Sequence, residues 1–263
     1  MELPKNFLFE LNNHIATVTL NRPKALNALN KDVMEELHDF FSNQLPQMGC
    51  KGVVLTGSGD RAFAAGADIK EFMTMDRIQM EAQSKLGHQL MFAIEKSPIP
   101  VVAAIEGYAL GGGFELALAC HLRVGSEKAR MGNPEVNLGI IPGYGATQRL
   151  PQLVGRGRSL DIMMTARMID ANEALEWGLL NRIAPVGKTV SVAKEIITLI
   201  GTKGPMAITK VIETVDAYYD KNKDGFAEEV ATFGSLSALD EFKEGTKAFV
   251  ENRPVNFKNQ DGI

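Results

Sequence analysis

A glutamate beside three consecutive glycines is the first feature of this sequence that could do chemistry. Glu115 follows the glycines 111–113 closely, and an apolar run at 101–105 before them predicts a short buried strand. The apolar residues 114–120 predict a helix, so the glycines would form the turn where it begins. Glycine lets the backbone approach a ligand, and free N–H groups in a helix's first turn favour negative charge. The segment is therefore either a ligand site or a structural turn with a solvated glutamate.

A second stretch, 63–72, starts with small residues and leads into another predicted helix start. Backbone N–H groups are left free for a ligand at such a start, although an ordinary capped helix has the same pattern. A further acidic candidate, Glu135, lies in the loop 133–139, where an exposed carboxylate without a chemical role would look the same. These segments are candidates whose role the local pattern leaves open.

The surrounding pattern predicts an α/β protein in which these segments connect strands to helices. From about residue 189 the chain is helical, and breaks near 204–205 and 223–225 divide that part into three helices. The predicted strands are 7–11, 15–20, 52–55, 101–105, 122–124 and 181–184, and the other predicted helices are 31–45, 77–96 and one that starts at 170–173.

Composition excludes several classes of function. The 263 residues are 45% hydrophobic with a net charge of −4, which predicts a sizeable core and no basic surface for nucleic acid. Two cysteines are too few for a disulfide framework, and the four histidines lack metal-ligand spacing. The sequence shows no signal pattern and no apolar run long enough to cross a membrane. We therefore expect no metal, no membrane association and a reducing compartment, the cytoplasm.

Five stretches in order resemble the enoyl-CoA hydratase/isomerase family, also called the crotonase family: 21–29, 63–72, 107–115, 133–150 and 244–258. The resemblance covers nearly the whole chain. It implies a spiral of strand-strand-helix turns over residues 1–195 and a helical C-terminal region over 196–263. It also implies an acyl-CoA substrate, a role in fatty-acid metabolism, and a homotrimer or hexamer. No cofactor is expected, because coenzyme A is part of the substrate.

The resemblance assigns roles to the candidate residues. In this family two backbone N–H groups bind the thioester carbonyl oxygen, and the matching positions are Ala67 and Gly112. Paired glutamates hold a water beside the double bond in the hydratases, and Glu115 and Glu135 match them. Adding water needs a base for the water and an acid for the α-carbon. We assign Glu115 mainly to the water and Glu135 to the α-proton.

Contacts with coenzyme A also follow from the resemblance. They fall on two segments near the glycine-rich turns and on two C-terminal positions: Lys24, Ala25, Leu26, Asp68, Ile69, Lys70, Phe249 and Lys258. In the family, the C-terminal positions sometimes reach coenzyme A from a neighbouring subunit. A solvated surface charge remains the alternative for each lysine.

Three residues depart from the usual pattern of the hydratases. Tyr144 and Ala146 stand where alanine and glycine are common, and Phe114 stands where cysteine is common. These changes would reshape the acyl pocket. The resemblance favours a hydratase that converts 2-enoyl-CoA to 3-hydroxyacyl-CoA. The alternatives are a hydratase of branched, methylglutaconyl-type acyl-CoA, an enoyl-CoA isomerase, and a non-catalytic CoA-binding protein.

Overall fold

Six strands form the larger of two sheets in the computed structural model, which describes residues 5–257. Only the first pair, β1 and β2, is antiparallel. The central parallel strands, at 52–57 and 101–105, are buried on both faces, which explains their apolar runs. In spatial order the strands are β1 (Phe7–Asn12), β2 (Ile15–Leu20), β3 (Gly52–Gly57), β5 (Val101–Ile105), β7 (Leu122–Ser126) and β10 (Arg182–Ala184).

Four short strands form a second sheet that the sequence pattern did not predict. Consecutive strands enter alternate sheets, so β3–β4, β5–β6 and β7–β8 each contribute one strand to both before the chain turns into a helix. The predicted spiral of strand-strand-helix turns is therefore confirmed. The second sheet runs in the order β4 (Ala62–Ala65), β6 (Tyr108–Leu110), β8 (Arg130–Gly132) and β9 (Ile169–Asp170).

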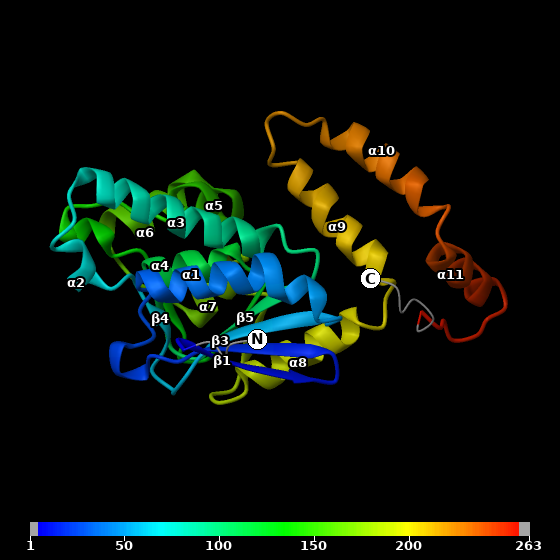
Figure 1. Cartoon of the computed structure of the whole chain (residues 1–263), viewed down its shortest axis with the longest axis horizontal. Coiled ribbons are helices and arrows are strands. Elements are labelled where there is room, and N and C mark those ends of the chain that lie inside the picture. Colours follow the sequence, from blue (N-terminus) through cyan, green and yellow to red (C-terminus); the bar gives the residue numbers. More distant parts are fainter. Residues whose placement is uncertain (1–4, 258–263) are drawn as a thin grey trace.

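Helices cover both faces of the larger sheet (Figure 1). The helix α8 packs Ala193, Ile196 and Ile197 against one face, and α1, α3 and α4 contribute to the main core on the other. The core helices are α1 (Lys31–Asp39), α2 (Ile69–Phe72), α3 (Arg77–Glu95), α4 (Gly112–Ala119), α5 (Ala146–Val154), α6 (Arg156–Thr165), α7 (Ala171–Glu176) and α8 (Thr189–Ile200). Short helical turns are η1 (Pro23–Ala25), η2 (Phe40–Gln44), η3 (Leu45–Gln47) and η4 (Glu135–Leu138).

The predicted helix 31–45 changes its form partway along. It is α-helical to Asp39 and continues as the π-helix η2, whose Phe40 and Phe41 are both buried. The Phe40 ring meets Phe7 of β1 edge-on, with centroids 5.4 Å apart. Wider π-helical turns occur mostly as short insertions in α-helices, and here the insertion directs both rings into the core.

Three helices leave the core and form a C-terminal arm (Figure 1). They are α9 (Pro205–Ala217), α10 (Gly225–Leu236) and α11 (Asp240–Val250). The sequence predicted one helix where α10 and α11 stand, because no glycine or proline marks the break at 237–239. The predicted boundary between residues 195 and 196 lies within α8, and the division into two domains stays a prediction. In the described chain, no helix is both long and apolar enough to cross a bilayer.

Candidate active site

Glu115 lies on α4, a helix buried along its whole length between neighbouring helices and the second sheet. The side chain is 1% exposed. Its Oε1 accepts hydrogen bonds from the backbone N–H groups of Tyr144 (2.8 Å) and Ala146 (2.9 Å). Burial raises the pKa of Glu115 to about 7, and the two N–H donors oppose that shift. Glu115 can therefore take up or release a proton near neutral pH.

Glu135 approaches the same place from η4. A methyl group built on Gly111 would lie 3.0 Å from Glu135 Oε1, so the glycine leaves room for the carboxylate. Gly111 also has a φ of 50°, which glycine adopts without strain. Burial raises the pKa of Glu135, and the Asn133 side chain, which donates to Oε1 at 3.4 Å, opposes the shift. The charge of Glu135 adds to the effect of burial on Glu115, so the two carboxylates are coupled.

Two backbone N–H groups converge beside this pair. In the extended segment before α2, Asp68 N–H donates to Leu29 O at 3.0 Å. Successive N–H groups of an extended chain point to opposite sides, so the Ala67 N–H points away from Leu29. A methyl group built on Gly112 would lie 3.5 Å from the Ala67 nitrogen, which places the two residues side by side. Within residues 5–257, neither the Ala67 nor the Gly112 N–H donates a hydrogen bond, so both donors are available.

The Tyr144 ring fills the space between α3 and the start of α4. A side chain on Gly87 of α3 would collide with the ring, and a methyl group on Gly112 would lie 3.0 Å from Tyr144 Cε2. Among the described residues, the buried Tyr144 hydroxyl and the Gln83 amide nitrogen have no hydrogen-bond partner. Tyr144 therefore lies against the candidate site, and its effect on the acyl pocket stays a prediction.

Two predicted CoA-binding segments lie side by side. Ala65 N–H donates to Leu26 O at 3.0 Å, and the Arg22 guanidinium forms an ion pair with Asp68 at 3.1 Å. Lys24 and Ala25 are exposed on η1, and Leu26 is half-buried. Ile69 and Lys70 are exposed on α2, so both segments present polar and apolar groups at the surface. Asp68 forms this ion pair with its side chain 22% exposed, and its contact with coenzyme A stays a prediction.

Of the two C-terminal candidates, Phe249 is not brought to this site by its own chain. Phe249 is exposed on α11 at the end of the arm, far from α4 (Figure 1). Lys258 lies outside the described residues. A role for Phe249 in the same chain's site is thus not supported by its position.

Sequence reasoning missed a buried ion pair behind the glutamates. Arg149 on α5 bonds Glu95 on α3 through Nε at 3.0 Å and Nη2 at 2.8 Å. The two residues are 54 positions apart, so no local spacing pattern connects them. A sequence signal did exist, because an arginine in the mostly apolar inner face of α5 must find a partner when it is buried.

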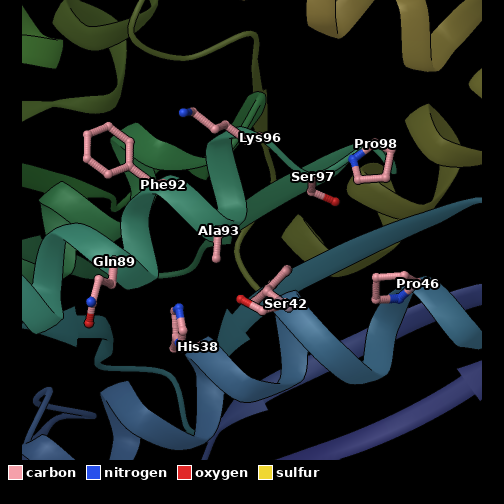
Figure 2. Close-up of a pocket in the computed structure, with 10 residues that line it drawn as sticks. His38, Ser42, Pro46, Gln89, Phe92, Ala93, Lys96, Ser97 and Pro98 are labelled. Atoms are coloured by element: carbon pink, nitrogen blue, oxygen red, sulfur yellow. The ribbon is translucent and has the colours of Figure 1, made fainter.

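A surface groove between α1, η2 and the C-terminal half of α3 is separate from these residues (Figure 2). His38 and Ser42 line one side, and Gln89 and Ala93 line the other. Neither glutamate contributes to the groove. Across residues 5–257, no group of three or more histidine, cysteine or acidic side chains is arranged to hold a metal ion.

Comparisons with known proteins agree with this arrangement. A family model described as enoyl-CoA hydratase/isomerase matches residues 10–260. The short-chain-enoyl-CoA hydratase of Clostridium acetobutylicum is 39% identical over 262 residues, 99% of this chain and 100% of that protein. The crotonyl-CoA hydratase of Syntrophomonas wolfei is 38% identical, covering 96% and 98%. A crystal structure of enoyl-CoA hydratase from Bacillus anthracis superposes with a TM-score of 0.91 at 36% identity, covering 97% and 99%.

Proposed function

This chain belongs to the enoyl-CoA hydratase/isomerase family, and we propose that Glu115 and Glu135 carry its reaction. It is an enoyl-CoA hydratase that adds water reversibly across the 2,3 double bond of 2-enoyl-CoA thioesters to give 3-hydroxyacyl-CoA. One observation carries the assignment of the two residues. A buried carboxyl with a pKa of about 7 is coupled to a second carboxyl beside two unpaired backbone donors.

The Ala67 and Gly112 N–H groups would bind the thioester carbonyl oxygen. Negative charge grows on that oxygen when a nucleophile attacks C3, because the electrons of the double bond move toward the carbonyl. Donors fixed by the backbone stabilise such an oxyanion without reorganisation, and losing one donor typically costs about 10²–10³ in rate. The start of α4 adds the positive end of its dipole.

The two glutamates would move the protons. Glu115 takes a proton from water while the water oxygen bonds to C3, and Glu135 gives a proton to C2, so the product gains one water overall. The roles reverse in dehydration. Because the pair is coupled, each proton belongs to the pair as much as to one residue.

The charge around Tyr144 favours an uncharged acyl group. Burial raises the pKa of the Tyr144 hydroxyl most, the Gln83 side chain opposes that shift, and the charges of Glu115, Glu71 and Glu135 add to it. A carboxylate on the acyl chain would face the same three charges. This supports a short neutral chain over a methylglutaconyl-type substrate, which carries an extra carboxylate.

For coenzyme A, we propose contacts along the exposed surfaces of η1 and α2, with Lys24 and Lys70 near the phosphates. Ala25, Leu26 and Ile69 would contact the apolar parts of the molecule. We propose no further cofactor. The two buried cysteines are unpaired, which supports a reducing compartment such as the cytoplasm.

The arm supports a homo-oligomer, a trimer or hexamer. Phe226, Val230 and Phe233 are exposed on α10 at spacings of four and three residues, so they form one apolar stripe on the helix. A second copy of the chain would bury this stripe. Phe249 at the end of the arm could then reach a neighbouring subunit's substrate.

The test is loss of the conjugated enoyl-thioester absorbance with crotonyl-CoA, with the product identified as 3-hydroxybutyryl-CoA. Glu115→Gln and Glu135→Gln should each lower kcat by about 10³-fold or more while CoA still binds. Glu127→Gln, on the exposed surface, is the control and should match the wild type. A wild-type protein that binds CoA without turnover would refute the hydratase. A glutamine variant with full activity would refute its assigned residue.

A further inference from the structure

Arg149 is a buried cation whose charge acts on Glu115, and the mechanism above does not use it. It is 6% exposed. Its Nε and Nη2 form a two-point contact with Glu95, and its Nη1 donates to the carbonyl oxygen of Tyr144 at 3.2 Å. A buried guanidinium persists only when such partners compensate for lost hydration. The geometry of a guanidinium fork fixes the direction of each of these bonds.

The turn that Arg149 contacts is the one that holds Glu115. Tyr144 and Ala146 donate their N–H groups to Glu115 Oε1, and Gly145 between them has a φ of 115°. A side chain on Gly145 would collide with Arg149 Nη1, so the turn wraps directly around the guanidinium. The backbone N–H of Arg149 also donates to Gly145 O at 2.9 Å, in the first turn of α5. One end of the turn is thus fixed by the arginine, and two of its N–H groups fix the carboxylate.

We infer that Arg149, anchored by Glu95, is a positioning residue that holds the turn 144–146 so that its two N–H groups keep Glu115 aimed at the substrate. This inference rests on the proposed function of Glu115. It identifies a clamp that links α3, α5 and α4 behind the site. Arg149 itself does not touch the substrate.

The charges around the clamp give it a second effect. Burial raises the pKa of Glu115, Glu135 adds to that shift, and Arg149 opposes it. His88 on α3 lies beside the clamp, and burial followed by the charge of Arg149 lowers its pKa, which keeps it neutral at pH 7. Burial and, less strongly, the charge of Glu71 of α2 raise the pKa of Tyr144. On α9, the pKa of Asp216 is raised by burial and by the charge of Glu95, and lowered by that of Lys96.

The aromatic ring of Phe92 limits the movement of the guanidinium. The ring centroid is 5.1 Å from Arg149 and 5.4 Å from Lys96, within the range of a cation–π contact. Figure 2 shows Phe92 on the last turn of α3 and Lys96 just after the end of that helix. The same ring also stacks with His88 at 6.1 Å. Arg149 therefore has one preferred position, as a positioning role requires.

The test compares Arg149→Met, Arg149→Lys and Glu95→Gln with the wild type across pH in the crotonyl-CoA assay. Arg149→Met should lower kcat about 10- to 100-fold with little change in KM, because the base is misplaced and the substrate contacts remain. Without the cation, the pKa of Glu115 rises further. The acid limb of the hydration profile should then move to higher pH by roughly half a unit to one unit. Arg149→Lys keeps the charge but loses the fork, so kcat should fall without that shift.

A matched control is Arg167→Met. Arg167 also forms a two-point contact with a glutamate, Glu173, and bonds Asp161, but it donates nothing to the turn. This variant should lower Tm and leave the pH profile unchanged. An equal shift in Arg167→Met, or a wild-type profile and kcat in Arg149→Met, would overturn the inference.

Two further measurements keep the outcome interpretable. If Arg149→Met does not fold, Arg149→Lys and Glu95→Gln test the positioning role instead. A wild-type kcat in both variants would overturn the inference. A carbon-13 NMR titration of glutamate carboxyls measures the Glu115 pKa without turnover. An upward shift in Arg149→Met there, in a protein with no hydratase activity, would sustain the clamp while refuting the proposed function. An unshifted resonance in Arg149→Met would refute the clamp.

Discussion

The core and the C-terminal arm bury their large side chains to very different extents. In the core, Phe63 and Phe114 are completely buried, whereas Phe226, Phe233 and Phe249 of the arm are 85%, 79% and 88% exposed. Burying one such side chain contributes about 1.5–3 kcal/mol. The core obtains that stabilisation within one chain. The arm obtains this stabilisation only when another molecule covers its exposed phenylalanines.

The difference in burial separates the candidate catalytic groups, which lie in the core, from the exposed apolar groups of the arm. Both glutamates and both candidate oxyanion donors belong to the core, where backbone N–H groups hold Glu115 and the Asn133 side chain bonds Glu135. The arm supplies only Phe249 to the candidate site residues, and its own chain does not bring that ring to α4. One chain is therefore sufficient to form the proton-transfer groups, and a second copy would complete the substrate contacts.

The same substitution in the two regions gives the sharpest contrast. Gly113→Ala in α4 would drive a methyl group into the backbone oxygen of Ala64, and backbone cannot move aside cheaply. We expect a loss of about 3 kcal/mol or more in the free energy of unfolding. Gly234→Ala in α10 meets nothing within 4 Å. It should stabilise the chain by roughly 0.5–1 kcal/mol, because alanine favours a helix.

Urea unfolding of both variants would measure this. An equal loss of stability from both substitutions would break the comparison, since it would mean that the arm is packed as tightly as the core. If Gly234→Ala lowered the free energy of unfolding only at high protein concentration, the surface around Gly234 would lie at a contact between copies of the chain.

A second contrast comes from buried charge. Folding raises the pKa of Glu115 from an ordinary value of 4.5 to about 7, mainly through burial. The folded protein thus holds this proton more tightly than the unfolded chain. The associated stability is fully present below about pH 4.5 and is lost as the pH rises through about 7. Glu115→Gln removes the charge and should gain, relative to wild type, on the order of 3 kcal/mol by pH 8.

Denaturant titrations at pH 5 and pH 8 test this, with Glu228→Gln on the exposed α10 as the matched change in the arm. Glu228→Gln should leave the stability unchanged in both buffers. A Glu115→Gln variant no more stable than wild type at pH 8 would contradict the buried charge, and with it the main reason for the altered proton affinity.

The arm itself can be tested through its apolar stripe. Phe233→Asp places a charge in the middle of the stripe formed with Phe226 and Val230, where burial against another copy would be costly. We expect the mass measured by light scattering to fall toward that of one chain, with kcat reduced less than in the glutamate variants. Ser235→Asp adds the same charge on the opposite face of α10 and should keep the assembly. An unchanged mass for Phe233→Asp would contradict an interface on this stripe.

The sequence predicted most of the core and little of what connects its parts. The buried parallel strands and the long α3 were correct, because continuous apolar runs and a helical period are local signals. The second sheet was missed, because its strands are only two to four residues long and too short to show an alternating pattern. Its strands β4 and β6 end at the two segments that carry Ala67 and Gly112, so the sheet aligns the candidate donors. No local pattern could show that alignment.

The candidate site divides in the same way. Glu115 and the glycines stood out from their spacing, but Glu135 and the donor Ala67 depended on family resemblance. The contacts that set the proton affinity of Glu115 come from Tyr144 and Ala146, about 30 positions away. These contacts depend on the closure of the spiral, which sequence patterns do not record. Their assignment to catalysis stays a prediction.

The smallest expected effect concerns the shape of the core rather than its chemistry. Tyr144 occupies its place only because Gly87 has no side chain, and its ring lies against Gly112 at the candidate donor. Tyr144→Ala should open this wall and raise kcat/KM for a medium-chain 2-enoyl-CoA, relative to crotonyl-CoA, by roughly tenfold. Tyr144→Phe keeps the ring and removes a buried hydroxyl that has no partner among the described residues. It should keep the chain-length preference and be as stable as wild type or more so. An unchanged preference in Tyr144→Ala would mean that the acyl chain leaves the glutamate pair in another direction, toward the exposed arm rather than into the core.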